Sequence, residues 1–235
     1  RRLKGCDVMT AIAIIPARGG SKGIPGKNKA LVGGISLVEH AIRTAREVPA
    51  ISRIIVSSDD PEILAIAKQS DVESIVRPEE LAGDDSPIEL AIEHALLESS
   101  KNGQLPATLV LLQPTSPLRD SRLLSQSLAK FQTDGGVGSV FGVVPAEHHP
   151  SKMLRIDGEF VVPFTSAAEL SAPRQALPRV VRQSGSLYIV STENFLATRT
   201  LFVPPTRWVE VGAMEAIDID NPADLTAADR AVNDL

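Results

Sequence analysis

The chain of 235 residues is long enough for one large domain with a sizeable buried core. Its apolar content of 43% excludes global disorder, and its single cysteine, Cys6, excludes an intramolecular disulfide and a cysteine-based zinc cage. The net charge of −5 argues against a general nucleic-acid binder. The charge is uneven, however, because residues 1–30 contain Asp7 as their one acid beside a set of basic residues: Arg1, Arg2, Lys4, Arg18, Lys22, Lys27 and Lys29. A basic segment on an acidic chain suggests a local anion site.

Residues 1–10 do not resemble a signal peptide, because the apolar stretch after them is short and is followed by a proline and a charge. We expect these residues to be a leader or tag remnant, with Met9 as the natural start. No run of residues reaches the length of a membrane span. These features predict a cytoplasmic protein whose partners include neither a membrane nor a nucleic acid.

From residue 11 to residue 144, short β-branched runs alternate with amphipathic segments. We expect strands at 11–16, 51–58, 71–76, 108–113 and 139–144. We expect helices near 36–47, from Pro61 to about residue 69, at 87–100 and at 120–132. Such alternation predicts an α/β fold in which a parallel or mixed sheet carries helices on both faces.

The alternation stops after Val144, and residues 145–185 are rich in Pro, His and Arg. We interpret this stretch as an insertion in a single domain of residues 11–235, serving as a lid or a dimerisation element. Short strands are expected near 153–156, 159–162 and 186–190. The chain then returns to order with AIDID at 216–220, treated as a strand, and with a last helix from Pro222 to about residue 232, for which Asn221 is the expected N-cap.

A glycine-rich basic loop follows the first strand, at residues 16–29. Glycines let a backbone approach a phosphate closely, and Arg18, Lys22, Lys27 and Lys29 add the charge that a polyphosphate needs. The spacing matches neither the dinucleotide-binding GxGxxG pattern nor the Walker pattern. A solvated basic turn is the alternative. The position directly after a buried strand favours a phosphate loop of another type.

Asp218 and Asp220 are separated by one residue, and on a strand such positions share a face. Two adjacent carboxylates repel each other, and a hard cation such as Mg²⁺ would relieve that repulsion. On spacing alone, two exposed carboxylates or an N-cap system are equally good interpretations. Gln113, at the end of another predicted strand, could bind sugar hydroxyls or simply terminate the strand.

The segment AIIPARGGSKGIPGKN at 13–28 resembles the N-terminal signature of the acylneuraminate cytidylyltransferases, the CMP-sialic acid synthetases. The resemblance continues in order through IIVSSDD, VRPEELAGD, LLQPTSPLR, EHHPSKM, PRQALP, GSLYI and IDIDNPADL. Members of the family couple CTP to a nine-carbon 2-keto acid sugar and release pyrophosphate. The resemblance implies a three-layer mononucleotide-binding, Rossmann-like mixed sheet, and a small insertion through which two subunits form a homodimer.

The resemblance also implies roles for individual residues. The nucleotide would be bound by Ala17, Arg18, Gly19, Gly20, Ser21, Lys27, Asn28, Arg77 and Asp84. The acidic keto-sugar would be bound by Gln113, Lys152, Arg174, Tyr188 and Phe202. Asp218 and Asp220 would hold the catalytic Mg²⁺, while Arg18 and Lys27 would neutralise charge on the α-phosphate and the departing pyrophosphate. Arg119 is given no catalytic role.

Departures from the family pattern cluster on the acceptor side. A Thr/Ser-rich run common in relatives is replaced here by residues 85–88, an Asn by Ser184, and a Phe-Phe pair by Leu201 and Phe202. The acceptor could therefore be a legionaminic, pseudaminic or eight-carbon keto acid, or a phosphonate. A nucleotide-binding regulator without activity is a further alternative, against which the presence of Lys27, Asp218 and Asp220 speaks.

Overall fold

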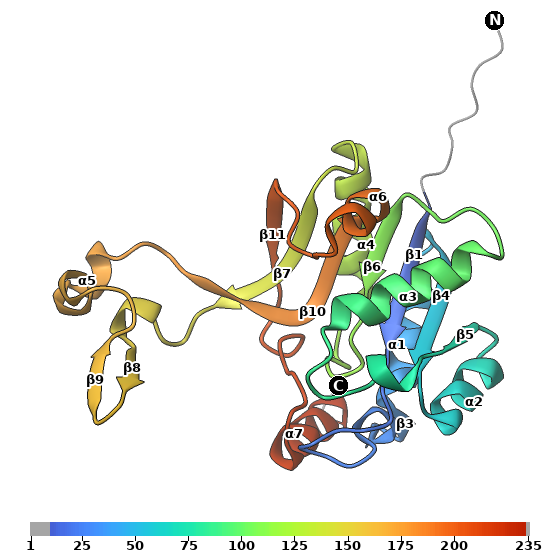
Figure 1. The fold of residues 1–235 in the computed structure, drawn as a ribbon, viewed down its shortest axis with the longest axis horizontal. Coiled ribbons are helices and arrows are strands. Elements are labelled where there is room, and N and C mark those ends of the chain that lie inside the picture. The colour runs from blue at the N-terminus through green and yellow to red at the C-terminus, as the bar shows by residue number, and fades with distance from the viewer. Residues whose placement is uncertain (1–9, 234–235) are drawn as a thin grey trace, which may run out of the picture.

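A seven-stranded sheet is the centre of the computed structural model, which describes residues 10–233 (Figure 1). The strands lie in the order β11 (Thr206–Glu210), β7 (Ser139–Pro145), β10 (Val181–Ser191), β6 (Thr108–Leu111), β1 (Ala11–Pro16), β4 (Ile51–Ser58) and β5 (Glu73–Val76). Neighbours pair in parallel except β10, which is antiparallel to both β6 and β7. The predicted mixed sheet is confirmed.

Helices cover both faces of this sheet, as the alternation predicts. One face packs against α1 (Leu37–Arg46), α2 (Pro61–Gln69) and α4 (Ser121–Thr133), and the other against α3 (Ile88–Ser100) and α6 (Thr192–Thr198). The first strand is buried on both sides because successive side chains point into opposite cores. Asp60 and Asp120 cap α2 and α4 by accepting hydrogen bonds from backbone amides of the first turn.

The segment 216–220 is not a strand, so that part of the prediction is wrong. Residues 217–220 have no regular structure and pass across the carboxyl edge of the sheet, where Ile219 N donates to Thr115 O at 2.8 Å. The helix after it, α7 (Pro222–Asn233), is confirmed, and Asn221 Oδ1 accepts from the amides of Ala223 and Asp224 as an N-cap does. Ile219 packs with α7 against β2 (Leu31–Val32), which pairs with β3 (Ile35–Ser36).

Residues 146–180 leave the sheet between β7 and β10 and form a projecting arm (Figure 1). The arm contains the hairpin of β8 (Leu154–Asp157) and β9 (Phe160–Pro163), the short α5 (Ala167–Ser171) and the 3₁₀ helices η3 (Pro150–Lys152) and η4 (Arg174–Ala176). The strand expected at 186–190 is part of the longer β10, which starts at Val181 in the main sheet. The predicted insertion therefore extends too far by residues 181–185, because their backbone pairs with β7 or bulges within β10.

Several short elements have no counterpart in the sequence-based prediction: β2, β3, β11, α6, η1 (Lys27–Lys29) and η2 (Glu79–Leu81). The leader predicted for residues 1–10 lies outside the described residues except for Thr10. None of the helices within residues 10–233 is long and apolar enough to cross a membrane.

Candidate active site

A cleft of about 270 Å³ opens at the carboxyl ends of the strands β1, β4, β5 and β6. Open α/β sheets place ligands at this edge. Of the residues singled out from the sequence, the cleft is lined by Arg18, Gly20, Ser21, Lys27, Asn28, Arg77, Asp84 and Gln113. These side chains are far apart in the sequence and come together because each follows the end of a neighbouring strand.

The glycine-rich loop is held in place by hydrogen bonds to the rest of the sheet edge. Gly19 N donates to Asp59 Oδ1 at 2.9 Å, and Ala17 N donates to Ser57 O at 3.0 Å. Within the loop, the buried Asn28 donates from Nδ2 to Arg18 O at 2.8 Å. Asn28 and Gly19 thus support the loop backbone, while the neighbouring side chains remain available to a ligand.

Gly23 lets the loop pack directly against the segment that carries the two aspartates. A Cβ built on Gly23 would lie 2.2 Å from Asp220 O, a distance that no side chain can occupy. The loop and the aspartate segment can therefore approach this closely only with glycine at position 23.

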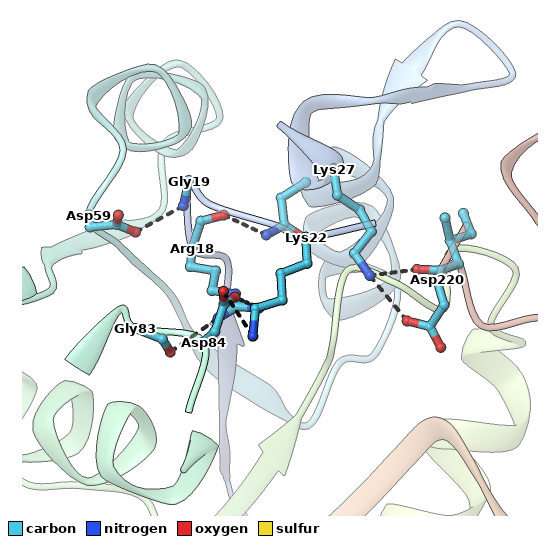
Figure 2. A network of polar contacts seen from close by, with 10 residues as sticks. Arg18, Gly19, Lys22, Lys27, Asp59, Gly83, Asp84 and Asp220 are labelled. Carbon is cyan, nitrogen blue, oxygen red and sulfur yellow. Dashed lines mark hydrogen bonds and ion pairs between the residues drawn. The ribbon is translucent and has the colours of Figure 1, made fainter. Parts of the chain in front are cut away.

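Three basic residues of the loop face carboxylates across the cleft (Figure 2). Arg18 Nη2 lies 2.8 Å from Asp84 Oδ1, and Lys22 Nζ lies 3.3 Å from Asp84 Oδ2. Lys27 Nζ lies 3.2 Å from Asp220 Oδ1 and donates to Ile219 O at 2.8 Å. Asp84 therefore pairs with two cations of the loop at once.

Lys29, expected from the sequence to belong with the basic residues of the loop, is not among the residues that line the cleft. Its Nζ lies 2.8 Å from Asp60 Oδ2 and 2.7 Å from Glu62 Oε2, at the start of α2. Hydrogen bonds to Asp60 and Glu62 raise the pKa of Lys29. The 3₁₀ turn η1 directs Lys29 away from Lys27, which sequence proximity cannot reveal.

Arg77 is a buried cation at the back of the cleft, 6% exposed. Its Nη2 donates to Ser57 O at 2.8 Å and its Nε to Ser57 Oγ at 3.2 Å, which anchors it to the end of β4. Burial lowers the pKa of Arg77, and the nearby charge of Arg18 adds to the effect, whereas Asp59 opposes it. The cleft thus combines a fixed cation with the more exposed cations of the loop.

Asp218 and Asp220 are exposed as whole residues and stand on either side of the buried Ile219. Burial of the carboxyl group raises the pKa of Asp218, as does the charge of Asp220, while a hydrogen bond from Thr115 and the charges of Lys27 and Arg119 lower it. Within residues 10–233, no cluster of three or more acidic, His or Cys side chains could hold a metal. The pair nevertheless supplies hard oxygen donors beside a phosphate-sized cleft, a combination that suits Mg²⁺, which keeps several waters and takes phosphate ligands.

The predicted acceptor residues do not all meet at this cleft. Gln113 lines it, and Tyr188, on β10, is buried with its ring 5.0 Å from that of Phe141. Burial raises the pKa of Tyr188, and the charge of Asp218 adds to that effect. Phe202 is 59% exposed and stacks edge-on against the same Phe141 at 5.8 Å.

Lys152 and Arg174 lie on the projecting arm. Lys152 Nζ donates to the carbonyl oxygens of Leu170 and Ala172, each at 2.5 Å, at the end of α5. In the single chain Lys152 therefore stabilises the arm as a cation at a helix C-terminus.

Two residues of the cleft were not singled out from the sequence. Ser86 lines the cleft, and its hydroxyl is buried with no hydrogen-bond partner among the described residues. Thr115 lines the cleft beside Gln113 and hydrogen-bonds to Asp218. Both lie in segments that the family resemblance covers, Ser86 in the divergent residues 85–88 and Thr115 in LLQPTSPLR, but neither was assigned an individual role from the sequence.

Comparison with known proteins gives a consistent group of relatives. A family model described as cytidylyltransferase matches residues 12–162. The chain is 30% identical, over 92% of its length and 93% of the relative, to a CMP-N,N'-diacetyllegionaminic acid synthase of Legionella pneumophila. It is 29% identical, over 92% of its length, to an N-acylneuraminate cytidylyltransferase of Escherichia coli, of which it spans about half, 51%. It is 26% identical to a pseudaminic acid cytidylyltransferase of Campylobacter jejuni, over 94% of this chain and 95% of the relative.

Solved structures share the fold at lower sequence identity. A CMP:2-keto-3-deoxy-manno-octonic acid synthetase complexed with CTP superposes with a TM-score of 0.69 at 17% identity, over 96% of this chain and 100% of that one. A 4-diphosphocytidyl-2C-methyl-D-erythritol synthase from Anaerococcus prevotii gives a TM-score of 0.63 at 15% identity, over 97% of this chain and 100% of that one.

Proposed function

The chain belongs to the cytidylyltransferase family, and from that premise we propose that it transfers CMP from CTP to the anomeric hydroxyl of a nine-carbon, acidic 2-keto sugar. The observation that carries the proposal is the cleft in which Arg18, Lys22 and Lys27 face Asp84 and Asp220. Relatives named for legionaminic, N-acylneuraminic and pseudaminic acids support an acidic sugar as the acceptor.

The nucleotide half of the reaction would use the loop cations and Arg77. The triphosphate replaces carboxylate oxygens as the partner of Arg18 and Lys27, and these cations then offset the charge that builds up on the departing pyrophosphate. Arg77, held by Ser57, is positioned before the ligand arrives and needs no rearrangement. The protein contributes mainly position and charge to such a transfer.

Asp218 and Asp220 are the residues that would hold Mg²⁺. A bound Mg²⁺ would supply a Lewis acid that polarises the α-phosphate and lowers the pKa of the attacking hydroxyl. Lys27 Nζ lies 3.2 Å from Asp220 Oδ1, so the carboxylate that would bind the metal and the cation that would bind phosphate are neighbours.

In the acceptor half of the reaction, the anomeric oxygen forms a bond to the α-phosphorus while the bond from that phosphorus to the bridging oxygen breaks. The hydroxyl proton passes to solvent water, and pyrophosphate departs with the bridging oxygen and its electron pair. Gln113, on the cleft wall, would orient the sugar through its amide.

We propose that the working unit is a homodimer joined through the projecting arm. Large apolar side chains of the arm are exposed in the single chain, among them Ile156 at 81% and Phe160 at 74%. An apolar surface of this kind favours a protein partner. Exchange of arms would bring Lys152 and Arg174 to the cleft of the second subunit, where cations can bind the acceptor's carboxylate.

The test is pyrophosphate release from CTP with a panel of acids: N-acetylneuraminic, N,N'-diacetyllegionaminic, pseudaminic and 2-keto-3-deoxy-manno-octonic acids. We expect Mg²⁺-dependent release with at least one nine-carbon acid. Turnover of the eight-carbon acid alone would reassign the acceptor. Binding of CTP without release for any acid would instead favour a nucleotide-binding regulator.

A further inference from the structure

Arg119 is a buried cation that the reaction described above does not use. It follows the turn after Gln113 and precedes α4. Its Nε donates to Ser186 O at 2.7 Å, and its Nη2 donates to Gln113 O. The guanidinium therefore joins the end of β6 to β10, two strands that meet at the edge of the cleft.

The surroundings of Arg119 are unusual for a cation that serves only as a cross-link. Its Nη1 is buried and has no hydrogen-bond partner among the described residues. Burial lowers the pKa of Arg119 to about 9, and the charge of Asp218 is the main opposing influence. A buried charge with incomplete partners is costly, so a role beyond stability is the better explanation for it.

The two carbonyl groups that Arg119 holds belong to parts of the backbone that surround Asp218. Gln113 lines the cleft, and Ser186 follows Gly185 in the bulge of β10. A Cβ on Gly185 would lie 3.1 Å from Ser116 Oγ and 3.4 Å from Asp218 Oδ2, so the bulge lies directly against the aspartate. A shift of Ser186 would move Gly185 relative to Asp218.

Arg119 has no comparable link to the nucleotide half. The residues that line the cleft include Arg18, Lys27 and Arg77 but not Arg119. The supports of Arg77 and of the loop come from Ser57 and Asp59, on the other side of β1. Loss of Arg119 therefore leaves the Ser57 and Asp59 contacts of Arg77 and Gly19 in place.

We propose that Arg119 is a positioning residue for the acceptor half of the site: by tying Gln113 to Ser186 it sets the place of the acceptor-binding amide relative to Asp218. The proposal rests on the proposed function. Arginine suits this role because its planar fork donates to two carbonyl groups at once, which lysine cannot do in the same geometry.

The experiment compares the wild type with Arg119→Met and Arg119→Lys, and uses Arg122→Met as the matched control. Arg122 lies on the same helix start, and its side chain is 88% exposed. We expect Arg119→Met to raise the KM of the acceptor about tenfold or more and to lower kcat, since small misplacements in an active site have effects of this size. The Kd of CTP, measured by calorimetry without acceptor, should stay within about twofold of the wild type.

Arg119→Lys retains the charge and one of the two hydrogen bonds, so it should recover part of the loss. An equal loss of CTP affinity and acceptor affinity in Arg119→Met would overturn the proposal, because a general weakening of the fold would then explain the result. If Arg119→Met does not fold, the lysine variant decides: an unchanged acceptor KM overturns the proposal, and an increase with normal CTP binding supports it. Failure of the wild type with every acid would refute the acceptor assignment itself, before any variant is compared.

Discussion

The cleft and the projecting arm differ in how the rest of the chain supports them. The cleft residues stand at the ends of buried strands, and hydrogen bonds to Ser57, Asp59 and other fixed groups hold them in place. The arm leaves the sheet, and its hairpin of β8 and β9 pairs only with itself among the described strands. Ile156 and Phe160 of this hairpin are mostly exposed. The cleft is thus assembled within one chain, whereas the arm leaves apolar side chains exposed, which is the basis of the proposed dimer.

The residues expected to bind the two substrates are divided between the cleft and the arm. The residues expected to bind CTP already face one another, and of the residues predicted to bind the acceptor, Gln113 shares their cleft. Lys152 and Arg174 are on the arm, so a dimer is required if they are to reach an acceptor. Substitutions in the cleft should consequently lower activity at any protein concentration. Substitutions in the arm should lower activity by weakening the dimer, so their effect should depend on protein concentration.

The largest effect is expected for Lys27→Ala. Its Nζ bonds both Ile219 O and Asp220, and in the proposed reaction its loss removes a cation that offsets charge on the departing pyrophosphate. We expect kcat to fall by about 10²–10³-fold, as for the removal of a group that stabilises transition-state charge. Pyrophosphate release measures the effect, and Lys22→Ala, whose side chain is 74% exposed, should lose much less. Near-normal pyrophosphate release by Lys27→Ala at every protein concentration would contradict the role proposed for the cleft.

The second-largest loss of activity is expected for Gly23→Ala. The added Cβ would meet Asp220 O at 2.2 Å, so the loop and the aspartate segment must separate. We expect kcat to fall by up to about 10²-fold, with a small change in Tm, because the displacement affects the site and spares the core. Gly212→Ala is the control, since its nearest contact for a Cβ is an ordinary 3.7 Å. Equal activity of the two variants would contradict a close fit at position 23.

The arm is tested by the double variant Ile156→Ser with Phe160→Ser. Removing two exposed apolar side chains should raise the dissociation constant of the dimer about tenfold or more, because their burial at an interface is lost. Sedimentation velocity should show the shift towards monomer, together with a higher acceptor KM and an unchanged CTP affinity. Leu97→Ser, a 51% exposed position on α3, is the control. If the wild type is monomeric and the double variant has the same activity, the proposed dimer with exchanged arms is wrong.

The smallest effect, on stability and not on activity, is expected for Glu73→Gln at the start of β5 in the main sheet. Arg53 donates to Glu73 from Nε at 2.8 Å and from Nη2 at 2.9 Å, and Ser99 Oγ donates to it at 3.0 Å. These bonds, Arg53 foremost, lower the pKa of Glu73. Because its side chain is 34% exposed, we expect a loss of only about 1 kcal/mol in the free energy of unfolding at pH 7.

The pH dependence of that difference has a defined sign. A carboxyl group whose pKa is lower in the folded state stabilises the fold above its unfolded pKa, and this stabilisation is lost as the pH falls through the folded pKa. Denaturant melts of Glu73→Gln and the wild type should therefore converge in acid. A constant difference down to the lowest pH would argue against the ion pair as its source. Glu98→Gln, which breaks an exposed pair with Lys101, is the control with no measurable change expected.

The parts of the fold that could be predicted are those with a strong local pattern. Strands such as Ala11–Pro16 and Thr108–Leu111 are apolar runs, and Ser36, Asp60 and Asp120 mark helix starts. The missed β11 is an edge strand whose Trp208 is 59% exposed, so it has no buried run to reveal it. The strand expected at 216–220 is apolar enough, yet its backbone finds no strand partner at the sheet edge.

By itself, the sequence determined the main strands and helices with strong local patterns, the composition of the loop after the first strand and the presence of two closely spaced aspartates. Each of these is a property of residues near one another in the chain. The tertiary structure alone decided which charges meet: Lys29 turns to α2, Asp84 holds Arg18 and Lys22, and Arg119 is buried beneath Asp218. Those outcomes depend on strand ends from distant parts of the chain that converge at one edge of the sheet, and on burial, which a local pattern does not encode.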